Sequence, residues 1–288
     1  MGINIEGQIE KVNGKELSYT EFAKRYMEKN HPVVVTGLMD LLHWRASSDW
    51  VTPLGQPNFH FFSSHFGASQ VQVADCDTRE FTDQKREEMS VSDFIEHCLQ
   101  VEGSAVHCNN DNHTSNDHSV PYLKDWHFVK EYPEYAAYIT PMFFCDDWLN
   151  LYLDNFRMHT DSDTCQQNTE ICSSDYRFVY MGVKGSWTPL HADVFRSYSW
   201  SSNVCGKKRW LFLDPSQCHL VFDRNMKNCV YNIFDEVSDS KFPGFKKAIW
   251  LEYTQEAGEI IFVPSGWYHQ VHNLSMLALS SDDSVQDI

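Results

Sequence analysis

The chain has few positive charges and no long apolar run. It carries 23 Lys and Arg against 40 Asp and Glu, which gives a formal net charge of −17. That balance argues against non-specific binding to nucleic acid or to an anionic membrane, and it is compatible with a basic protein or peptide partner. The N-terminus, MGINIEGQIEKVNGKELS, lacks the apolar core of a signal peptide, and no later run is long enough to cross a bilayer. We therefore expect a soluble protein that makes no membrane contact.

The nine cysteines lack the close pairing of a zinc or redox motif. They are odd in number and scattered, so we expect the reduced thiols of an intracellular protein. No internal repeat is visible. The 288 residues, 42% hydrophobic and 14% aromatic, suffice for one large domain or two small ones.

The first half of the chain mixes helical and strand-like segments. Residues 18–30 carry apolar side chains at helical spacing behind Ser18, which predicts a capped amphipathic helix. The run PVVVTGL predicts a buried strand, residues 70–74 predict another, and MSVSDFIEHCL predicts a second helix. A further helix is predicted from about Asp146.

Two polar segments read as exposed loops, over residues 101–120 and 159–175. The first holds His107, Cys108, His113 and His118, but their spacing matches no metal-site template. We interpret both segments as solvated loops.

After residue 175 the chain becomes a series of short β-rich runs separated by turn residues, the pattern of an antiparallel sandwich or barrel. Residues 221–253 interrupt the series and read as an excursion between core strands. We predict a mainly β fold with flanking helices (α+β). Its barrel core covers residues 141–288, and residues 1–140 form a flanking region of helices and strands packed on it.

One short motif carries the chemistry. His191 and Asp193 lie two residues apart in an extended run, so both side chains leave the same face of a sheet. His269, in VPSGWYHQVHN, is the best candidate for a third ligand. Two imidazoles and one carboxylate form a facial triad, which suits non-haem Fe(II) and leaves positions open for substrate and oxygen. An isolated H-x-D is also common as an ordinary strand pair.

Two more residues fit the same chemistry. Iron oxygenases that use 2-oxoglutarate hold its distal carboxylate with a cation and a hydroxyl, and Lys208 and Thr188 suit those tasks. His272 lies in the same strand-like run as His269 and is an alternative third ligand, but strand alternation puts the two side chains on opposite faces. Asn273 shares the face of His269 and suits either a role in orienting the site or a simple turn role.

The segments GSWTPLHADVFRSYSWSSNVCGKKRW and GEIIFVPSGWYHQVHNL together resemble the core of the jumonji-C (JmjC) oxygenases. The resemblance runs from about Phe22 to Leu274 and implies a double-stranded β-helix (jelly-roll, cupin-like) barrel. It implies Fe(II) held by His191, Asp193 and His269, with 2-oxoglutarate and O2 as co-substrates and with Lys208 and Thr188 on 2-oxoglutarate. Tyr122, in YLKDWH, stands where related hydroxylases place a tyrosine that reaches the co-substrate; the alternative is a buried core tyrosine.

The combination of YLKDWH, YRFVYMG, HADVFRSYSW and GKKRW resembles one branch of this family, associated with cytosolic lysyl hydroxylation of the translation-termination release factor. The resemblance thus implies a protein lysyl hydroxylase with the release factor as its partner. Two alternatives stay open: an N-methyl-lysine demethylase of histones or other proteins, and a catalytically impaired binding module. The sequence predicts no direct nucleic-acid contact and leaves the oligomeric state open.

The chain departs from this family at its end. JmjC domains usually continue after HQVHNL into a closing strand with a polar residue near the co-substrate, and often into helices, whereas this sequence reads SMLALSSDDSVQDI. The segment from Leu274 to Leu279 is apolar enough to pair as a strand, and Ser281 suits the polar position. The sequence leaves open whether the barrel closes.

Overall fold

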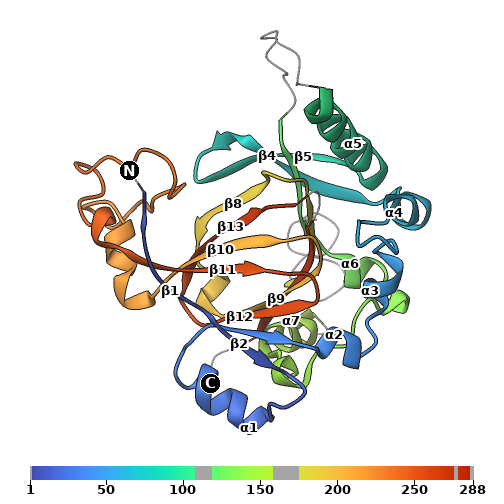
Figure 1. Cartoon of the computed structure of the whole chain (residues 1–288), viewed down its shortest axis with the longest axis horizontal. Coiled ribbons are helices and arrows are strands. Elements are labelled where there is room, and N and C mark those ends of the chain that lie inside the picture. The colour runs from blue at the N-terminus through green and yellow to red at the C-terminus, as the bar shows by residue number, and fades with distance from the viewer. Residues whose placement is uncertain (1, 108–118, 158–174, 276–277, 286–288) are drawn as a thin grey trace.

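Two β-sheets face each other in the computed structural model, which describes residues 2–107, 119–157, 175–275 and 278–285 (Figure 1). The first sheet has five strands. Its neighbours are antiparallel except for the parallel pair at one edge. In spatial order the strands are β1 (Asn4–Gln8), β11 (Ile249–Gln255), β10 (Lys208–Leu213), β13 (Tyr268–Asn273) and β8 (Trp187–His191).

The second sheet has nine strands and contains both N-terminal and C-terminal segments of the chain. In spatial order they are β2 (Glu10–Asn13), β3 (Val33–Thr36), β12 (Glu259–Val263), β9 (Tyr198–Cys205), β14 (Ala278–Val285), β7 (Arg177–Gly182), β6 (Pro121–Trp126), β4 (Gln70–Glu80) and β5 (Asp83–Ser90). Residues before 140 therefore do more than flank the barrel, because they supply strands to both sheets.

Apolar side chains fill the space between the sheets. One buried cluster joins Val34 on β3 and Ile261 on β12 to Phe212 on β10 and Val271 on β13. These strands are rich in β-branched and aromatic residues, which suit a pleated, buried surface. Burying a side chain of this kind stabilises the fold by about 1.5 to 3 kcal/mol relative to leaving it exposed.

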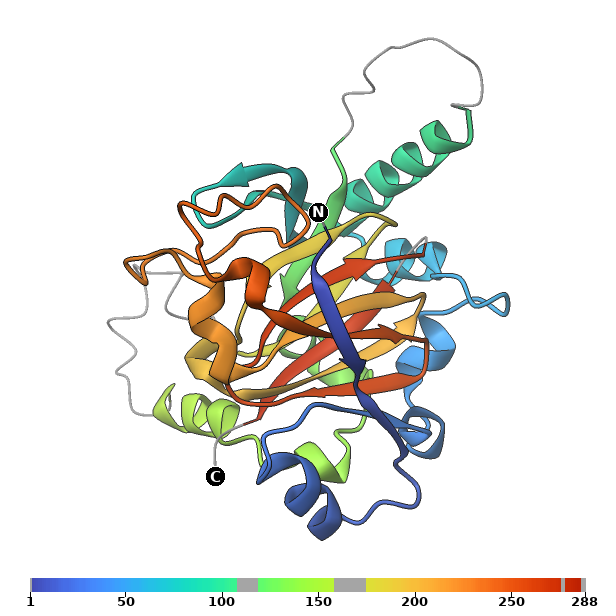
Figure 2. The same ribbon diagram turned by 60° about the vertical axis from the view of Figure 1, so that its left-hand side comes forward.

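The helices lie outside the barrel (Figures 1 and 2). Helix α5 and the β4–β5 hairpin lie at one end of the barrel, whereas α1 lies at the opposite end. No helix in the described ranges is both long enough and apolar enough to cross a membrane. The α-helices are α1 (Tyr19–Phe22), α2 (Leu38–Leu41), α3 (Arg45–Asp49), α4 (Phe59–Phe66), α5 (Val91–His107), α6 (Phe128–Glu131) and α7 (Trp148–Arg157).

The structure also contains short π-helical and 3-10 turns. A π-helical turn, η1 (Ala23–Met27), continues α1. The 3-10 turns are η2 (Pro133–Tyr135), η3 (Met142–Phe144), η4 (Val194–Arg196), η5 (Pro215–Val221) and η6 (Phe245–Lys247).

Most predicted elements are confirmed. The helix predicted over residues 18–30 is α1 with η1, and the Ser18 hydroxyl caps it by accepting a bond of 3.2 Å from the Glu21 N–H. The buried strand in PVVVTGL is β3, and the strand predicted at residues 70–74 opens β4. The helix in MSVSDFIEHCL is α5, before which the Ser90 hydroxyl accepts a bond of 3.1 Å from the Asp93 N–H.

Two predictions were wrong at their boundaries. The loop predicted over residues 101–120 is helical as far as His107, because α5 continues; Cys108, His113 and His118 lie outside the described residues, as does nearly all of the second polar loop. The excursion predicted over residues 221–253 ends earlier. Residues 249–255 form β11, which pairs with β1 and β10 inside the first sheet.

The strand β14 answers the question of closure. It pairs antiparallel with β7 on one side and with β9 on the other, so it fills the gap between them. Ser281 is opposite Val179 on β7 and Ser202 on β9. Leu277 lies outside the described residues. The C-terminal segment is thus an interior strand of the second sheet.

Candidate active site

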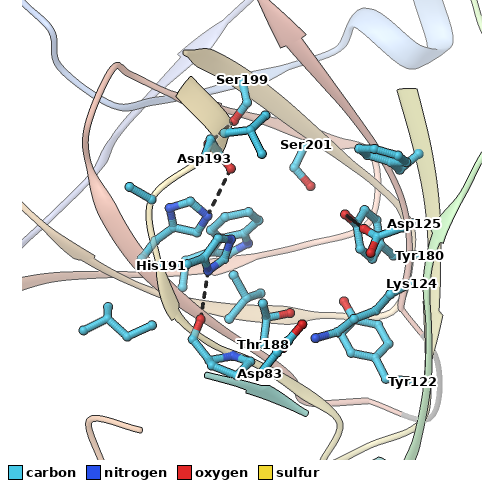
Figure 3. Close-up of a pocket in the computed structure, with 18 of the residues that line it drawn as sticks. Asp83, Tyr122, Lys124, Asp125, Tyr180, Thr188, His191, Asp193, Ser199 and Ser201 are labelled. Carbon is cyan, nitrogen blue, oxygen red and sulfur yellow. Dashed lines mark hydrogen bonds and ion pairs between the residues drawn. The ribbon is translucent and has the colours of Figure 1, made fainter. Parts of the chain in front are cut away.

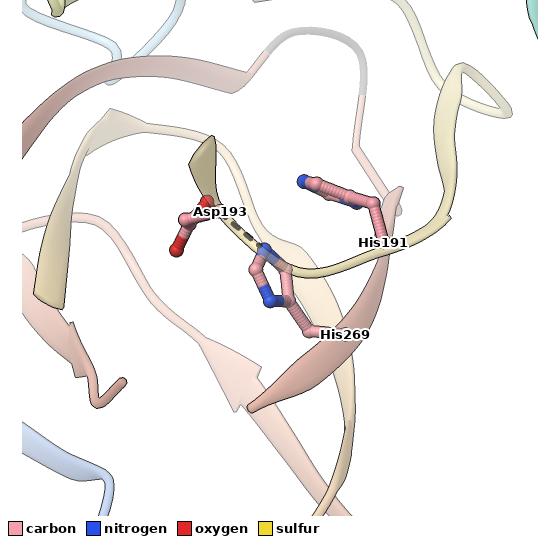
Figure 4. Close-up of side chains that lie close together, drawn as sticks. All are labelled: His191, Asp193 and His269. Atoms are coloured by element: carbon pink, nitrogen blue, oxygen red, sulfur yellow. Dashed lines mark ion pairs between the residues drawn. The ribbon is translucent and has the colours of Figure 1, made fainter. Parts of the chain in front are cut away.

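The structure brings His191, Asp193 and His269 together (Figure 4). His191 ends β8 and is opposite His269 on the neighbouring strand β13. The ligand atoms of the three side chains lie within 4.8 Å of one another. Asp193 lies beyond the end of β8, yet its backbone is still extended (φ −60°, ψ 158°), so the alternation predicted for H-x-D persists past the last paired residue.

Backbone carbonyl groups orient both imidazoles. His191 Nδ1 lies 2.8 Å from the Pro189 oxygen, and His269 Nδ1 lies 3.2 Å from the Trp267 oxygen. Because a carbonyl only accepts, each Nδ1 donates a proton, and each Nε2 keeps its lone pair for a metal. This arrangement is common among metal-binding histidines.

The third ligand is held from the other sheet. The Ser199 hydroxyl on β9 donates to Asp193 Oδ2 at 2.6 Å, while Asp193 Oδ1 lies 3.8 Å from His269 Nε2. One carboxylate oxygen is thus turned toward the two imidazoles. Burial lowers the pKa of His191 to about 4, the neighbouring His269 adds to this, and Asp193 opposes it. His191 is therefore neutral near pH 7, as a metal ligand has to be. Donor types and spacing both fit a divalent iron ion.

The competing residues on β13 point elsewhere. His272 stacks on Trp187 with ring centroids 5.7 Å apart, on the face opposite His269 as predicted. Asn273 donates to the Ser186 hydroxyl at 2.7 Å rather than to a metal ligand. Trp210 on β10 lines the pocket, with its ring 5.5 Å from that of His269.

A pocket of about 500 Å³ opens beside the three ligands (Figure 3). Thr188, Lys208 and Tyr122 all line it, so the structure brings together the six site residues predicted from the sequence. Lys208 and Tyr122 are buried, at 2% and 3% exposure. The sequence neighbours of Lys208 point away from the pocket: Lys207 pairs with Glu256, and Arg209 pairs with Glu252.

The pocket also contains residues that the sequence analysis missed. Lys124 lies on the same strand face as Tyr122, two residues along β6. Asp83 at the start of β5 and Asp125 on β6 bring carboxylates. The alternation in YLKDWH contained a signal for Lys124, because residues two apart on a strand share a face. Nothing in the sequence connected Asp83 to this site.

An acidic and aromatic wall faces the ligands across the pocket. The rings of Tyr176, Phe178 and Tyr180 follow one another at intervals of 6.2 Å beside β7. The Tyr180 hydroxyl donates to Asp125 Oδ1 at 2.7 Å, and the Arg86 guanidinium pairs with both Asp83 and Asp125. Asp125 has a left-handed backbone (φ 55°), a conformation that asparagine and aspartate tolerate better than most residues.

Lys208→Ala is expected to raise the KM for 2-oxoglutarate by roughly 10- to 100-fold, because it removes a charge-assisted bond worth about 1.5 to 3 kcal/mol. Iron binding should change far less. Lys207→Ala is the matched control, because the Lys207 side chain is 53% exposed and points away from the pocket. Steady-state kinetics with varied 2-oxoglutarate measure the effect. Equal KM values for wild type and Lys208→Ala would mean that Lys208 does not bind the co-substrate.

Gly182→Ala is expected to displace Tyr122. A Cβ at Gly182 would lie 2.3 Å from the Ser186 hydroxyl oxygen, 2.5 Å from Tyr122 Cδ2 and 2.6 Å from Asn273 Nδ2. Such overpacking typically costs about 1 to 3 kcal/mol. We expect weaker 2-oxoglutarate binding, measured by titration, whereas Gly103→Ala should have no effect, because its Cβ meets open space. Unchanged 2-oxoglutarate binding in Gly182→Ala would mean that Tyr122 does not contact the co-substrate.

Comparison with known proteins agrees with this geometry. A family model described as a cupin-like domain matches residues 19–283. "Arginine-specific demethylase JMJ20" of Arabidopsis thaliana is 66% identical over 274 residues, which cover 95% of this chain and 56% of the relative. "2-oxoglutarate and iron-dependent oxygenase JMJD4" is 39% identical over 267 residues in Danio rerio and 36% identical over 260 residues in Homo sapiens.

Those two alignments cover 90% and 89% of this chain, and 56% of each relative. The chain thus spans about half the length of the curated relatives it matches.

Proposed function

The chain belongs to the cupin-like JmjC domain family, and on this premise we propose that it is a 2-oxoglutarate- and iron-dependent dioxygenase that hydroxylates a lysine side chain of a protein substrate. His191, Asp193 and His269 would hold the iron on one face. When bound, iron and 2-oxoglutarate would together activate O2 for the oxidation of an unactivated C–H bond. The rest of the pocket has to admit one side chain and present one carbon.

The proposed substrate class rests on the acidic and aromatic wall of the pocket, which consists of Asp83, Asp125, Tyr176, Phe178 and Tyr180. Asp83 and Asp125 already hold one cation, the guanidinium of Arg86, beside the rings along β7. A substrate ammonium group brought to this wall meets carboxylate oxygens and aromatic faces, and both favour a positive charge. This supports a lysine or arginine side chain rather than an apolar or acidic one.

For the protein substrate we propose the translation-termination release factor, and with it a cytoplasmic location. The net charge of −17 is compatible with binding a basic segment of a partner. A second candidate is demethylation of a methylated arginine, favoured by the relative named as an arginine-specific demethylase. Hydroxylation of an N-methyl carbon leads to loss of that carbon as formaldehyde, so the two reactions differ in which carbon the pocket presents.

One mass-spectrometric experiment separates the two candidates. The protein is incubated with Fe(II), 2-oxoglutarate and either a candidate release factor or an arginine-methylated peptide, and Asp193→Ala serves as the inactive control. We expect one added oxygen on a lysine of the release factor. Loss of a methyl group from arginine with release of formaldehyde would favour the second candidate. Neither change, despite binding of both iron and 2-oxoglutarate, would contradict both.

A further inference from the structure

Lys124 is a buried cation in the pocket wall that the three metal ligands and the expected 2-oxoglutarate contacts leave unexplained. Its side chain is 2% exposed, although it lines the pocket. Burial lowers its pKa, while Asp83 and Cys76 oppose that effect. Burying an ammonium group is costly unless a partner of opposite charge offsets the loss of water.

The protein positions the ammonium group with neutral partners, and one of them is the Tyr122 ring, whose centroid lies 5.2 Å from Lys124 Nζ. Lys124 Nζ donates to Gln84 Oε1 at 2.7 Å, and Gln84 Nε2 donates to the Trp187 oxygen at 3.0 Å. Trp187 directly precedes Thr188 on β8. These hydrogen bonds therefore connect Lys124 to the strand that carries Thr188, whose hydroxyl group is expected to bind the co-substrate. Figure 3 shows the Lys124 nitrogen pointing into the cavity beside Thr188 and Tyr122.

No carboxylate oxygen of the described residues lies within 4.0 Å of Lys124 Nζ. The hydrogen bond to Gln84 also uses only one of the three N–H groups of the ammonium. The geometry therefore leaves Lys124 able to bind an anion that enters the cavity.

The formal charges of the pocket also favour a charged Lys124 that binds an anion. The lining contains three cations, Arg86, Lys124 and Lys208, and three carboxylates, Asp83, Asp125 and Asp193. Iron(II) and the 2-oxoglutarate dianion also cancel each other. Before a protein substrate binds, the lining with iron and 2-oxoglutarate therefore carries no net formal charge when Lys124 is charged, and a net negative charge when Lys124 is neutral.

We propose that Lys124 is a second cationic anchor for 2-oxoglutarate, binding the carboxylate remote from the metal together with Lys208 and Thr188. Two ammonium groups on one carboxylate select dicarboxylic 2-oxo acids over monocarboxylic ones. The inference rests on the oxygenase activity proposed above and does not depend on which protein side chain is oxidised.

The test compares two 2-oxo acids on the iron-loaded protein without oxygen. 2-Oxoglutarate and 2-oxopentanoate share the keto-acid end that chelates iron, but 2-oxopentanoate lacks the second carboxylate. The visible charge-transfer absorption of the complex reports binding without turnover. We expect Lys124→Met to raise the Kd of 2-oxoglutarate about 10- to 100-fold, as for loss of a charge-assisted bond, and to leave the Kd of 2-oxopentanoate nearly unchanged.

Lys85→Met is the matched control, because Lys85 follows Gln84 on β5 and 46% of its side chain is exposed. Both Kd values should match wild type in that variant. If Lys124→Met does not fold, Lys124→Gln repeats the test, since it keeps a donor toward Gln84 and removes the charge. Equal weakening of both ligands, or of neither, would overturn the proposal and leave Lys124 a packing residue. A wild-type complex without the absorption would contradict the oxygenase function as well.

Discussion

Replacing Asp193 with alanine is expected to abolish turnover while leaving the fold intact. The carboxylate is one of three ligand side chains within 4.8 Å of one another, and the cluster opens onto a pocket that already admits water. Residues that merely support metal ligands change metal affinity or activity by about 10- to 100-fold, so loss of a ligand itself should exceed about 100-fold. Succinate formation and substrate hydroxylation, measured together, report the effect.

Asp239→Ala provides the control, because this aspartate is 61% exposed in its side chain and pairs with Lys246 on the surface. Thermal melts of both variants should resemble wild type, since polar substitutions at solvated positions rarely change stability much. If Asp193→Ala still converts 2-oxoglutarate to succinate in step with hydroxylation, Asp193 is not a ligand.

Ser281→Pro is expected to unfold the protein or to destabilise it severely. Ser281 lies in β14, which pairs on both sides, and proline removes a ladder N–H from an interior strand. The carbonyl group left unpaired in the neighbouring strand alone costs about 1 to 3 kcal/mol. The separation of β9 from β7 would also move Ser199, which holds Asp193. Urea denaturation measures the loss.

Ser281→Ala keeps the backbone N–H and should melt close to wild type, which separates the strand pairing from any role of the hydroxyl. A denaturation midpoint for Ser281→Pro equal to that of wild type would mean that this segment does not pair inside the sheet in solution.

The metal ligands could be predicted from the sequence because two of them, His191 and Asp193, are close together in the chain. Strand alternation places His191 and Asp193 on one face and separates His269 from His272, while the resemblance to the JmjC oxygenases selected His269. The short β-rich runs also predicted the class of fold. The pairing of His191 with Asp193 and the mainly β class need only the period of a strand and the chemistry of the side chains.

The rest depended on contacts between segments far apart in the chain. Asp83 lies at the start of the edge strand β5, and only the pairing of β4 with both β5 and β6 brings it near Asp125. The strand β11 follows an irregular segment with mixed charges, so its place between β1 and β10 had no local signal. Strand alternation puts Lys124 on the face of Tyr122, but its burial results from packing against distant segments.

The orientation of both histidines has a consequence for how this site tolerates sequence change. The groups that fix each Nδ1 are main-chain oxygens two residues back, at Pro189 and Trp267. Every amino acid carries that oxygen, so substitutions at those two positions cannot delete the acceptor. The choice of the nitrogen that faces the metal is thereby independent of side-chain identity, and the walls of the pocket can diverge toward new substrates while the metal geometry is inherited unchanged.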